Sequence, residues 1–280
     1  MTVSKEKLKR LLGLDTEPSE QFEANQMTYL CPPGEGPHPA VLYCHAHGGE
    51  YSLGRREVTE GARWLASPPA KDLLGAGFAV VCIDMPGFGS RVSEGTESAL
   101  TKAAFWQGKP LFGQMIKEQL AVFNWLASQP NIKRDCIITL GTSMGAALAM
   151  WVAALEPRVA ASVQFCMLAD IAPMIEDGTH DKHGFYLTVP GLLEVAETGD
   201  IAGLIAPRPL FIGYGAKDHL TPQKALQSAL NRVQTAYAAS PNLQIYLSPD
   251  TGHIETQNMR CAALKFLADV FELKNKRILC

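Results

Sequence analysis

A serine lies between two glycines at the point where a buried strand is expected to become a helix. The sequence GTSMG at 141–145 follows the apolar run 136–140 and opens the alanine-rich segment 146–155. A turn this tight requires glycine on both sides, and it holds Ser143 in a strained backbone with its hydroxyl exposed. The pattern therefore predicts a nucleophilic serine. Because the same turn begins a helix, the backbone N–H of Met144 is the first candidate donor to a developing oxyanion.

A serine hydroxyl is a poor nucleophile until a base accepts its proton and an acid orients that base. Asp218 lies in the loop after the expected strand 209–214, and His253 follows the expected strand 243–247 and a turn. The order serine, acid, histidine is the one found when such a serine turn opens a helix. We therefore expect Asp218 to orient His253, and His253 to be the base. The alternatives are an aspartate that caps the next helix, a histidine in a surface turn, and His219 as the base, which adjoins the acid but follows no strand of its own.

A glycine-rich loop, residues 45–50, follows the expected early strand 41–45. Its two consecutive glycines allow the backbone to approach a substrate oxygen closely and to direct an N–H toward it. We expect the backbone N–H of His47 to be the second oxyanion donor, with Gly48 as the neighbouring candidate. His45 and His47 could instead bind a metal ion, but two histidines at i and i+2 without a nearby cysteine or carboxylate cluster are a weak zinc pattern. We expect no metal and no cofactor.

The composition limits the classes of protein that the chain can represent. Its 280 residues, 47% of them hydrophobic, suffice for one large α/β domain, and no linker or repeat divides them, so we expect a single domain over 1–280. The formal net charge of −3 gives no reason to expect nucleic acid or a membrane surface as a partner. The charged N-terminus has no apolar core of signal length and no segment reaches spanning length, so we expect a cytoplasmic protein. The seven cysteines lack CxxC spacing and several fall in apolar runs, which favours reduced thiols over a disulfide framework.

Strand and helix patterns alternate along the chain, which predicts a mostly parallel central sheet with helices on both faces. The expected parallel strands are 41–45, 79–83, 136–140, 160–166, 209–214 and 243–247, with 26–30 as an antiparallel edge strand. The expected helices lie near 58–75, 113–128, 144–155, 223–238 and 256–272. The loop 84–90 follows the second parallel strand, and we expect it to be a structural turn rather than a substrate contact.

The interval from 170 to 206 is too long for a simple connection between two elements. It lies between the serine-bearing helix and the strand before the acid, and segments inserted there lie above the carboxyl ends of the strands, where ligands bind. We therefore expect residues 170–206 to form a small cap over Ser143. Within it, His183 and Tyr186 are candidate substrate contacts, as is His180, although a polar residue on the cap surface is the simpler interpretation.

Together these residues resemble an α/β-hydrolase of the dienelactone-hydrolase-like group, and they are most similar to its branch of acetyl xylan esterase-type serine carboxylesterases. The resemblance spans roughly Pro39 to Leu267. It rests on the segments 45–49 (HAHGG), 84–89 (DMPGFG), 141–145 (GTSMG), 183–186 (HGFY), 189–193 (VPGLL) and 205–209 (IAPRP), together with Asp218 and His253. The roles that it implies are nucleophile for Ser143, orienting acid for Asp218, base for His253, and main-chain oxyanion donors for His47 and Met144.

The chain departs from the family pattern at two positions. Family members with dienelactone activity carry a cysteine nucleophile where this chain has Ser143, which argues against that substrate. The family loop often reads His-Gly-Tyr or His-Gly-His where this chain has Ala46, so the resemblance does not imply the geometry of this loop.

The leading hypothesis is a serine hydrolase that cleaves a carboxylic ester, with a short-chain acyl or acetyl group, through an acyl-enzyme. The runner-up is a serine peptidase of prolyl-oligopeptidase-like type, which we rank lower because no domain that would exclude large substrates precedes residue 40. A binding protein on a non-catalytic hydrolase fold is the third interpretation, and the complete set of Ser143, Asp218 and His253 argues against it. The expected partner is a small-molecule ester, and a homo-oligomer is compatible with the sequence.

Overall fold

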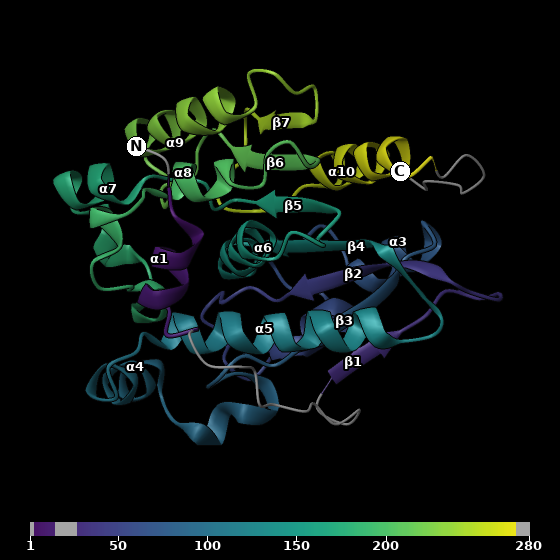
Figure 1. The fold of residues 1–280 in the computed structure, drawn as a ribbon, viewed down its shortest axis with the longest axis horizontal. Helices are drawn as coiled ribbons and strands as arrows, with labels where there is room; N and C mark the ends of the chain where they lie inside the picture. Colours follow the sequence, from purple (N-terminus) through teal and green to yellow (C-terminus); the bar gives the residue numbers. More distant parts are fainter. Residues whose placement is uncertain (1–2, 15–26, 273–280) are drawn as a thin grey trace.

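The computed structural model describes residues 3–14 and 27–272, and a seven-stranded sheet forms its centre in the order β1-β3-β2-β4-β5-β6-β7 (Figure 1). The strands are β1 Met27–Leu30, β2 His38–Cys44, β3 Ala79–Ile83, β4 Ile132–Thr142, β5 Ala161–Phe165, β6 Leu210–Gly215 and β7 Leu243–Ser248. β1 runs antiparallel to β3, and every other neighbouring pair is parallel. The expected parallel strands and antiparallel edge strand are confirmed, although Gln26 of the expected edge strand lies outside the described residues.

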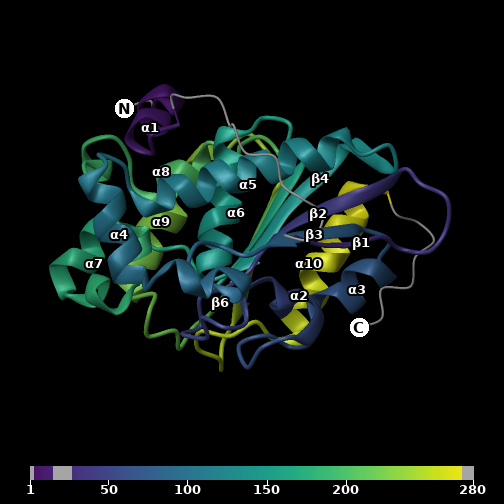
Figure 2. The same cartoon turned by 90° about the horizontal axis from the view of Figure 1, so that it is seen from below.

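Helices cover both faces of this sheet (Figure 2). One face carries α5 Leu111–Ser128, α6 Met144–Leu155, α8 Thr198–Gly203 and α9 Gln223–Ala236, and the other carries α2 Glu57–Glu60, α3 Pro69–Gly75 and α10 Gln257–Val270. Successive side chains of β2 point to opposite faces, so Leu42 packs with the first group and Tyr43 with the second. None of the helices in the described ranges is long and apolar enough to cross a membrane.

The helix α6 is buried along its whole length. All of its residues are buried, and its sequence MGAALAMWVAAL is apolar on every side, as is typical of a helix enclosed by neighbours. Small alanine side chains allow β4, β5, α5 and α8 to pack closely around it. The first turn of α6, and the serine before it, are therefore held by the core of the protein.

Two further helices lie at the end of the sheet to which the parallel strands point, α4 Glu97–Trp106 and α7 Ile171–Asp177 (Figure 1). The insertion, residues 170–206, contains α7, α8 and three short 3₁₀ helices: η4 Thr179–Lys182, η5 Phe185–Leu187 and η6 Leu192–Glu194. η5 packs against α4 and α5, which connects the insertion to the main body.

The prediction of a helix near 58–75 is wrong. The chain forms the two short helices α2 and α3 there instead. α2 ends at Gly61, which has a φ of 78°. α3 begins at Pro69, whose ring suits the first turn of a helix but cannot continue one from the preceding residues. The intervening segment carries Trp64, which is buried under the loop after β2.

The short helix α1, Lys5–Leu11, was not expected from the sequence, and neither was α4. α1 packs against the main body through Leu8 and Leu12, which are both buried. A Cβ on Gly113 of α5 would lie 2.0 Å from the carbonyl oxygen of Leu12, so the glycine permits this close approach. Most residues of α1 are charged, so its few apolar residues form no clear helical pattern in the sequence.

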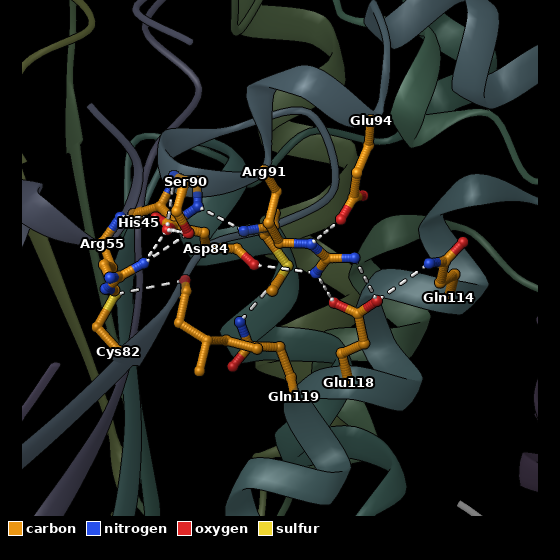
Figure 3. A network of polar contacts seen from close by, with 12 residues as sticks. His45, Arg55, Cys82, Asp84, Ser90, Arg91, Glu94, Gln114, Glu118 and Gln119 are labelled. Atoms are coloured by element: carbon orange, nitrogen blue, oxygen red, sulfur yellow. Dashed lines mark hydrogen bonds and ion pairs between the residues drawn. The ribbon is translucent and has the colours of Figure 1, made fainter. Parts of the chain in front are cut away.

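A network of ion pairs and hydrogen bonds holds the loop after β3 (Figure 3). The Asp84 carboxylate accepts the backbone N–H of Arg55 at 2.6 Å and also pairs with its guanidinium. The same carboxylate accepts the N–H and the hydroxyl of Ser90. Arg91 pairs with Glu118 of α5 at 2.5 Å. These contacts tie the loop to two neighbouring segments, as in a structural turn, but Gly87 of the same loop also lines the cleft at Ser143.

Among the cysteines in the described residues, which do not include Cys280, all but one follow the expectation. Cys31, Cys44, Cys82, Cys136 and Cys166 are free thiols. Cys261 is disulfide-bonded, so the expectation of reduced thiols is wrong at this position. The expectation was based on cysteines inside apolar strand runs, whereas Cys261 lies partly exposed on α10.

Candidate active site

Ser143 occupies the turn between β4 and α6 with a backbone φ of 56° and ψ of −119°. This conformation is strained for a residue with a side chain. Both flanking glycines are required by close packing: a Cβ on Gly145 would lie 1.9 Å from the carbonyl oxygen of Cys44, and a Cβ on Gly141 would lie 2.3 Å from the Gly145 carbonyl carbon. The Ser143 N–H donates to the carbonyl of Phe165 in β5 at 2.9 Å. The neighbouring strands therefore hold the strained turn in place.

The structure brings the three sequence-predicted polar residues together at the carboxyl end of the sheet. Ser143 Oγ lies 2.8 Å from His253 Nε2, and His253 Nδ1 lies 2.7 Å from Asp218 Oδ2. They follow β4, β7 and β6 respectively. In this arrangement Nδ1–H donates to the carboxylate, which leaves Nε2 free to accept the serine proton. His219, the rival base, also lines the cleft beside Ser143, but the imidazole hydrogen-bonded to the serine is that of His253.

The Asp218 carboxylate is buried and has further donors. Oδ1 accepts the Leu220 N–H at 2.9 Å, and Oδ2 accepts the Thr221 hydroxyl at 3.1 Å. Burial by itself raises the pKa of Asp218, but the hydrogen bond and charge of His253, with these two donors, lower the pKa below its ordinary value. The ionised carboxylate then favours the imidazole tautomer that carries its proton on Nδ1.

The glycine loop, residues 45–50, lies against the first turn of α6. A Cβ on Gly145 would lie 2.9 Å from the carbonyl oxygen of His45, so loop and turn are in direct contact. Across the described ranges, the N–H groups of His47 and Met144 donate to no protein acceptor. His47 lines the same cleft as Ser143, and Met144 is the next residue along the chain. Both amides are therefore free to donate to a substrate oxygen, and their role as oxyanion donors stays a prediction.

Each histidine of the glycine loop uses both ring nitrogens in contacts with the protein. His45 Nδ1–H donates to the carbonyl of Ala46 at 2.9 Å, and its Nε2 accepts a backbone N–H from the loop after β3 at 3.1 Å (Figure 3). Burial lowers the pKa of His45. His47 Nδ1 accepts the Gly49 N–H at 3.1 Å, so its Nε2–H donates to Glu97 at 2.6 Å. Metal binding by this pair would require these contacts to break, and in residues 3–14 and 27–272 no cluster of three potential ligands is present.

Glu97, the first residue of α4, joins the glycine loop to the insertion. One carboxylate oxygen accepts from His47 and from the Tyr51 hydroxyl at 3.2 Å, and the other accepts the backbone N–H of Tyr186 at 3.2 Å. The rings of His47 and Tyr186 stack with centroids 5.6 Å apart. Burial raises the pKa of Glu97, but the hydrogen bond and charge of His47 outweigh this and lower it. No motif in the sequence marks Glu97 for this role, because an acidic residue in a first helical turn is common.

The insertion places two of the predicted contact residues beside Ser143. His183 and Tyr186 line both cavities that reach the serine, whereas His180 lines neither. His183 Nε2–H donates to the carbonyl of Leu220 at 3.0 Å, and burial lowers its pKa. Burial raises the pKa of Tyr186, whose ring also packs near Phe112 of α5.

Two cavities of different size meet at Ser143 and His253. The open cleft has a volume of about 1000 Å³ and is lined by the glycine loop, the loop after β3 and residues 181–186 of the insertion. The closed pocket has a volume of about 40 Å³ and lies between α6 and the insertion. Its apolar walls include Ala147, Met150, Trp151, Met174, Val189 and Leu192.

Residues 28–261 match the dienelactone hydrolase family. The match spans most of the chain, so the chain belongs to this family, and its sheet and helices form the α/β-hydrolase fold. Family membership and the serine-based geometry support a carboxylic ester hydrolase as the class of enzyme.

Several known proteins are similar to this chain in sequence or in structure. YtaP of Bacillus subtilis (strain 168), whose name places it among hydrolases, is 37% identical over 236 residues, which are 83% of this chain and 79% of YtaP. The structure of acetyl xylan esterase 1 from Thermoanaerobacterium sp. JW/SL YS485 is similar with a TM-score of 0.66 at 20% identity, covering 96% of each chain. Methylesterase BT1017 is similar with a TM-score of 0.71 at 21% identity, covering 99% of this chain and 64% of that longer chain. At these identities the two structures support the shared fold.

Proposed function

We propose that this protein hydrolyses carboxylic esters of short acyl groups through an acyl-enzyme on Ser143. One observation carries the proposal: Ser143 Oγ, the His253 imidazole and the Asp218 carboxylate form a continuous hydrogen-bonded chain with distances of 2.8 Å and 2.7 Å. This chain lies where the closed pocket meets the open cleft. An ester bound across the junction would present its carbonyl carbon to the serine.

In the proposed reaction, His253 accepts the proton of Ser143 as Oγ attacks the ester carbonyl carbon. The carbonyl oxygen becomes negatively charged and accepts the N–H groups of His47 and Met144. His253 then gives the proton to the alcohol oxygen as the carbon–oxygen bond breaks, which leaves the acyl group on Ser143. A water molecule attacks this acyl-enzyme with His253 again as the base. The bond between the acyl carbon and Oγ then breaks, His253 returns the proton to Oγ, and the carboxylic acid leaves.

The two cavities suit the two halves of an ester. A cavity needs a volume of about 10–15 Å³ to hold one water molecule. The closed pocket, with its volume of about 40 Å³, therefore has room for a few heavy atoms such as those of an acetyl or propionyl group. The open cleft is much larger and presents the aromatic side chains of Tyr51, Trp64 and Phe185. We assign the acyl group to the closed pocket and the alcohol to the open cleft.

A series of p-nitrophenyl esters from acetate to octanoate tests this assignment with the full chain. We expect the highest kcat/KM at acetate or propionate, with a decrease of about tenfold or more by hexanoate, because each added methylene that does not fit costs binding energy. The Ser143→Ala variant measures the background. A maximum at octanoate would contradict the acyl assignment, and absence of ester cleavage would contradict the function.

An amide substrate separates the esterase from the peptidase alternative. An aminoacyl p-nitroanilide presents a leaving group of similar size but requires an amide bond to break. We expect the ester to be cleaved faster by several orders of magnitude in kcat/KM. If the amide is cleaved as fast as the ester, the peptidase becomes the better assignment, and if neither is cleaved, a binding role does.

A further inference from the structure

Glu57, the first residue of α2, is a fully buried carboxylate beneath the glycine loop. It accepts the Tyr43 hydroxyl at 2.7 Å and the Trp64 indole N–H at 2.9 Å. Both of its oxygens also lie within hydrogen-bond distance of the Ala46 N–H, at 3.1 Å and 3.2 Å. Burying a carboxylate is unfavourable unless hydrogen bonds compensate for the lost water, and these three donors supply that compensation.

The contacts of Glu57 reach the residues on both sides of His47. Its bond to the Ala46 N–H fixes the backbone immediately before His47. Its bond to Trp64 fixes an indole ring that packs directly on Gly48, where an added Cβ would lie 2.0 Å from the ring. The buried Glu57 side chain therefore holds the glycine loop on both sides of His47, the proposed oxyanion donor.

The contacts of Glu57 extend through Trp64 toward the segment that carries His253. The carbonyl of Trp64 accepts the N–H of Glu255, which lies two residues after His253. Glu255 is itself buried and pairs with Arg260 of α10, which also binds Asp72 of α3 at 3.0 Å. Arg260 is thus engaged by two other carboxylates. Trp64, which Glu57 holds in place, therefore contacts both the glycine loop around His47 and the segment that follows His253.

The charge of Glu57 is balanced by hydrogen bonds rather than by a cation. Within residues 3–14 and 27–272 it forms no ion pair. Burial raises the pKa of Glu57 to about 7, against the hydrogen bonds from Tyr43, Ala46 and Trp64, which lower it, and the nearby charge of Glu255 raises it further. Burial of this carboxylate without a cation lowers the stability of the folded protein, and Glu57 does not reach the cleft. A contribution to stability therefore does not explain its presence.

We infer that Glu57 is a positioning residue that holds the glycine loop so that the N–H of His47 faces the reacting carbonyl oxygen. The inference rests on the proposed function. Glu57 lines neither of the two cavities that reach Ser143, so it acts through Ala46 and Trp64 and not on the substrate.

The Glu57→Gln variant is the direct test, because it keeps the side-chain volume but replaces one acceptor oxygen with an N–H₂ group. That group would face N–H donors, so the loop backbone must shift. We expect kcat for p-nitrophenyl acetate to fall by about 10- to 100-fold, below the loss from removing an oxyanion donor outright, while KM changes by less than about threefold.

Tyr43→Phe is the matched control. It removes another donor to the same carboxylate but leaves the bonds to Ala46 and Trp64, so we expect kcat to change by less than about threefold. A second readout is the affinity for an alkyl boronic acid, which forms a tetrahedral adduct with an active serine. In Glu57→Gln this affinity should decrease in parallel with kcat/KM, whereas loss of stability alone would not change it in the folded fraction.

A folded Glu57→Gln protein with normal kcat would overturn the inference, as would an equal loss of kcat in Tyr43→Phe. If Glu57→Gln does not fold, Glu57→Asp replaces it: the charge remains, but the shorter side chain cannot reach all three donors, and the same loss of kcat is expected. Ser143→Ala keeps the two proposals apart. An active Ser143→Ala variant refutes the proposed function, whereas an inactive one combined with normal kcat in both Glu57 variants refutes only the role of Glu57.

Discussion

The closed pocket and the open cleft share Ser143 and His253 but differ in how their walls are held. The walls of the closed pocket come from α6, which is buried throughout, and from buried insertion residues such as Tyr186. The walls of the cleft come largely from loops, and Phe185 on its rim is 63% exposed. Side chains packed in a core cannot move without losing contacts, whereas exposed loop side chains can. With the proposed assignment of the acyl group to the closed pocket, the comparison predicts sharp selection of the acyl group and broad acceptance of the alcohol.

Ser143→Ala removes the atom at which the two cavities meet, and it should have the largest effect. We expect kcat/KM to fall by about 10⁴-fold or more for every ester, whatever its acyl or alcohol group, because no nucleophile remains. Steady-state rates across the ester series and a thermal melt are the measurements. Retention of activity toward any one ester would show that the two cavities do not share this nucleophile.

Asp218→Asn should have the next largest effect. We expect kcat to fall by about 10³- to 10⁴-fold with little change in KM, because the amide can stabilise the wrong tautomer of His253. Thr221→Val, which removes a neutral donor to the same carboxylate, is the control and should cost about tenfold or less. If Asp218→Asn is nearly as active as the parent, the acid assignment is wrong, and Asp250 is the next carboxylate to examine.

Met174→Ala tests the closed pocket directly. Met174 is buried in its wall, so its truncation should raise the ratio of kcat/KM for hexanoate to that for acetate by about tenfold. Phe185→Ala, which enlarges only the cleft side, should change this ratio by less than about twofold. Equal shifts in the two folded variants would remove the distinction between the cavities.

Glu57 should make the free energy of unfolding depend on pH, which is an effect on stability and not on the rate of the reaction. The pKa of Glu57 is raised from 4.5 to about 7 in the folded protein, so between these values the folded state binds a proton that the unfolded state has lost. The contribution of Glu57 to the free energy of unfolding must then decrease as pH rises from 4.5 to 7, by up to about 3 kcal/mol. Urea unfolding of the parent and Glu57→Gln at several pH values measures this difference. A difference that stays constant with pH would contradict the shift.

The sequence was sufficient to predict the sheet and to locate the site residues near one another. Ser143, Asp218 and His253 each follow an apolar strand, and the carboxyl ends of parallel strands converge at one edge of the sheet. The glycines around Ser143 also have a local cause, because their backbone positions exclude any side chain. Local patterns of this kind can be recognised in a linear sequence.

Glu57 and Glu97 could not be found in this way. The partners of Glu57 lie only 7 to 14 residues away, but they meet it only once the glycine loop has folded over α2. Glu97 binds Tyr186 of the insertion, which is 89 residues away in the chain. The broken helix after Glu57 has a different origin, because Gly61 and Pro69 are local signals that are visible in the sequence and that the prediction of one helix over 58–75 passed over. The disulfide at Cys261 depends on proximity and not on spacing.

Covalent labelling with a fluorophosphonate tests the central claim most directly, because the reagent reacts with a serine only where a base activates the hydroxyl. We predict that one phosphonate group is attached to the peptide containing Ser143, that its amount equals the fraction of esterase activity lost, and that Asp218→Asn slows the labelling. Complete inactivation with the label on another residue, or full labelling of Ser143 without loss of activity, would contradict the account.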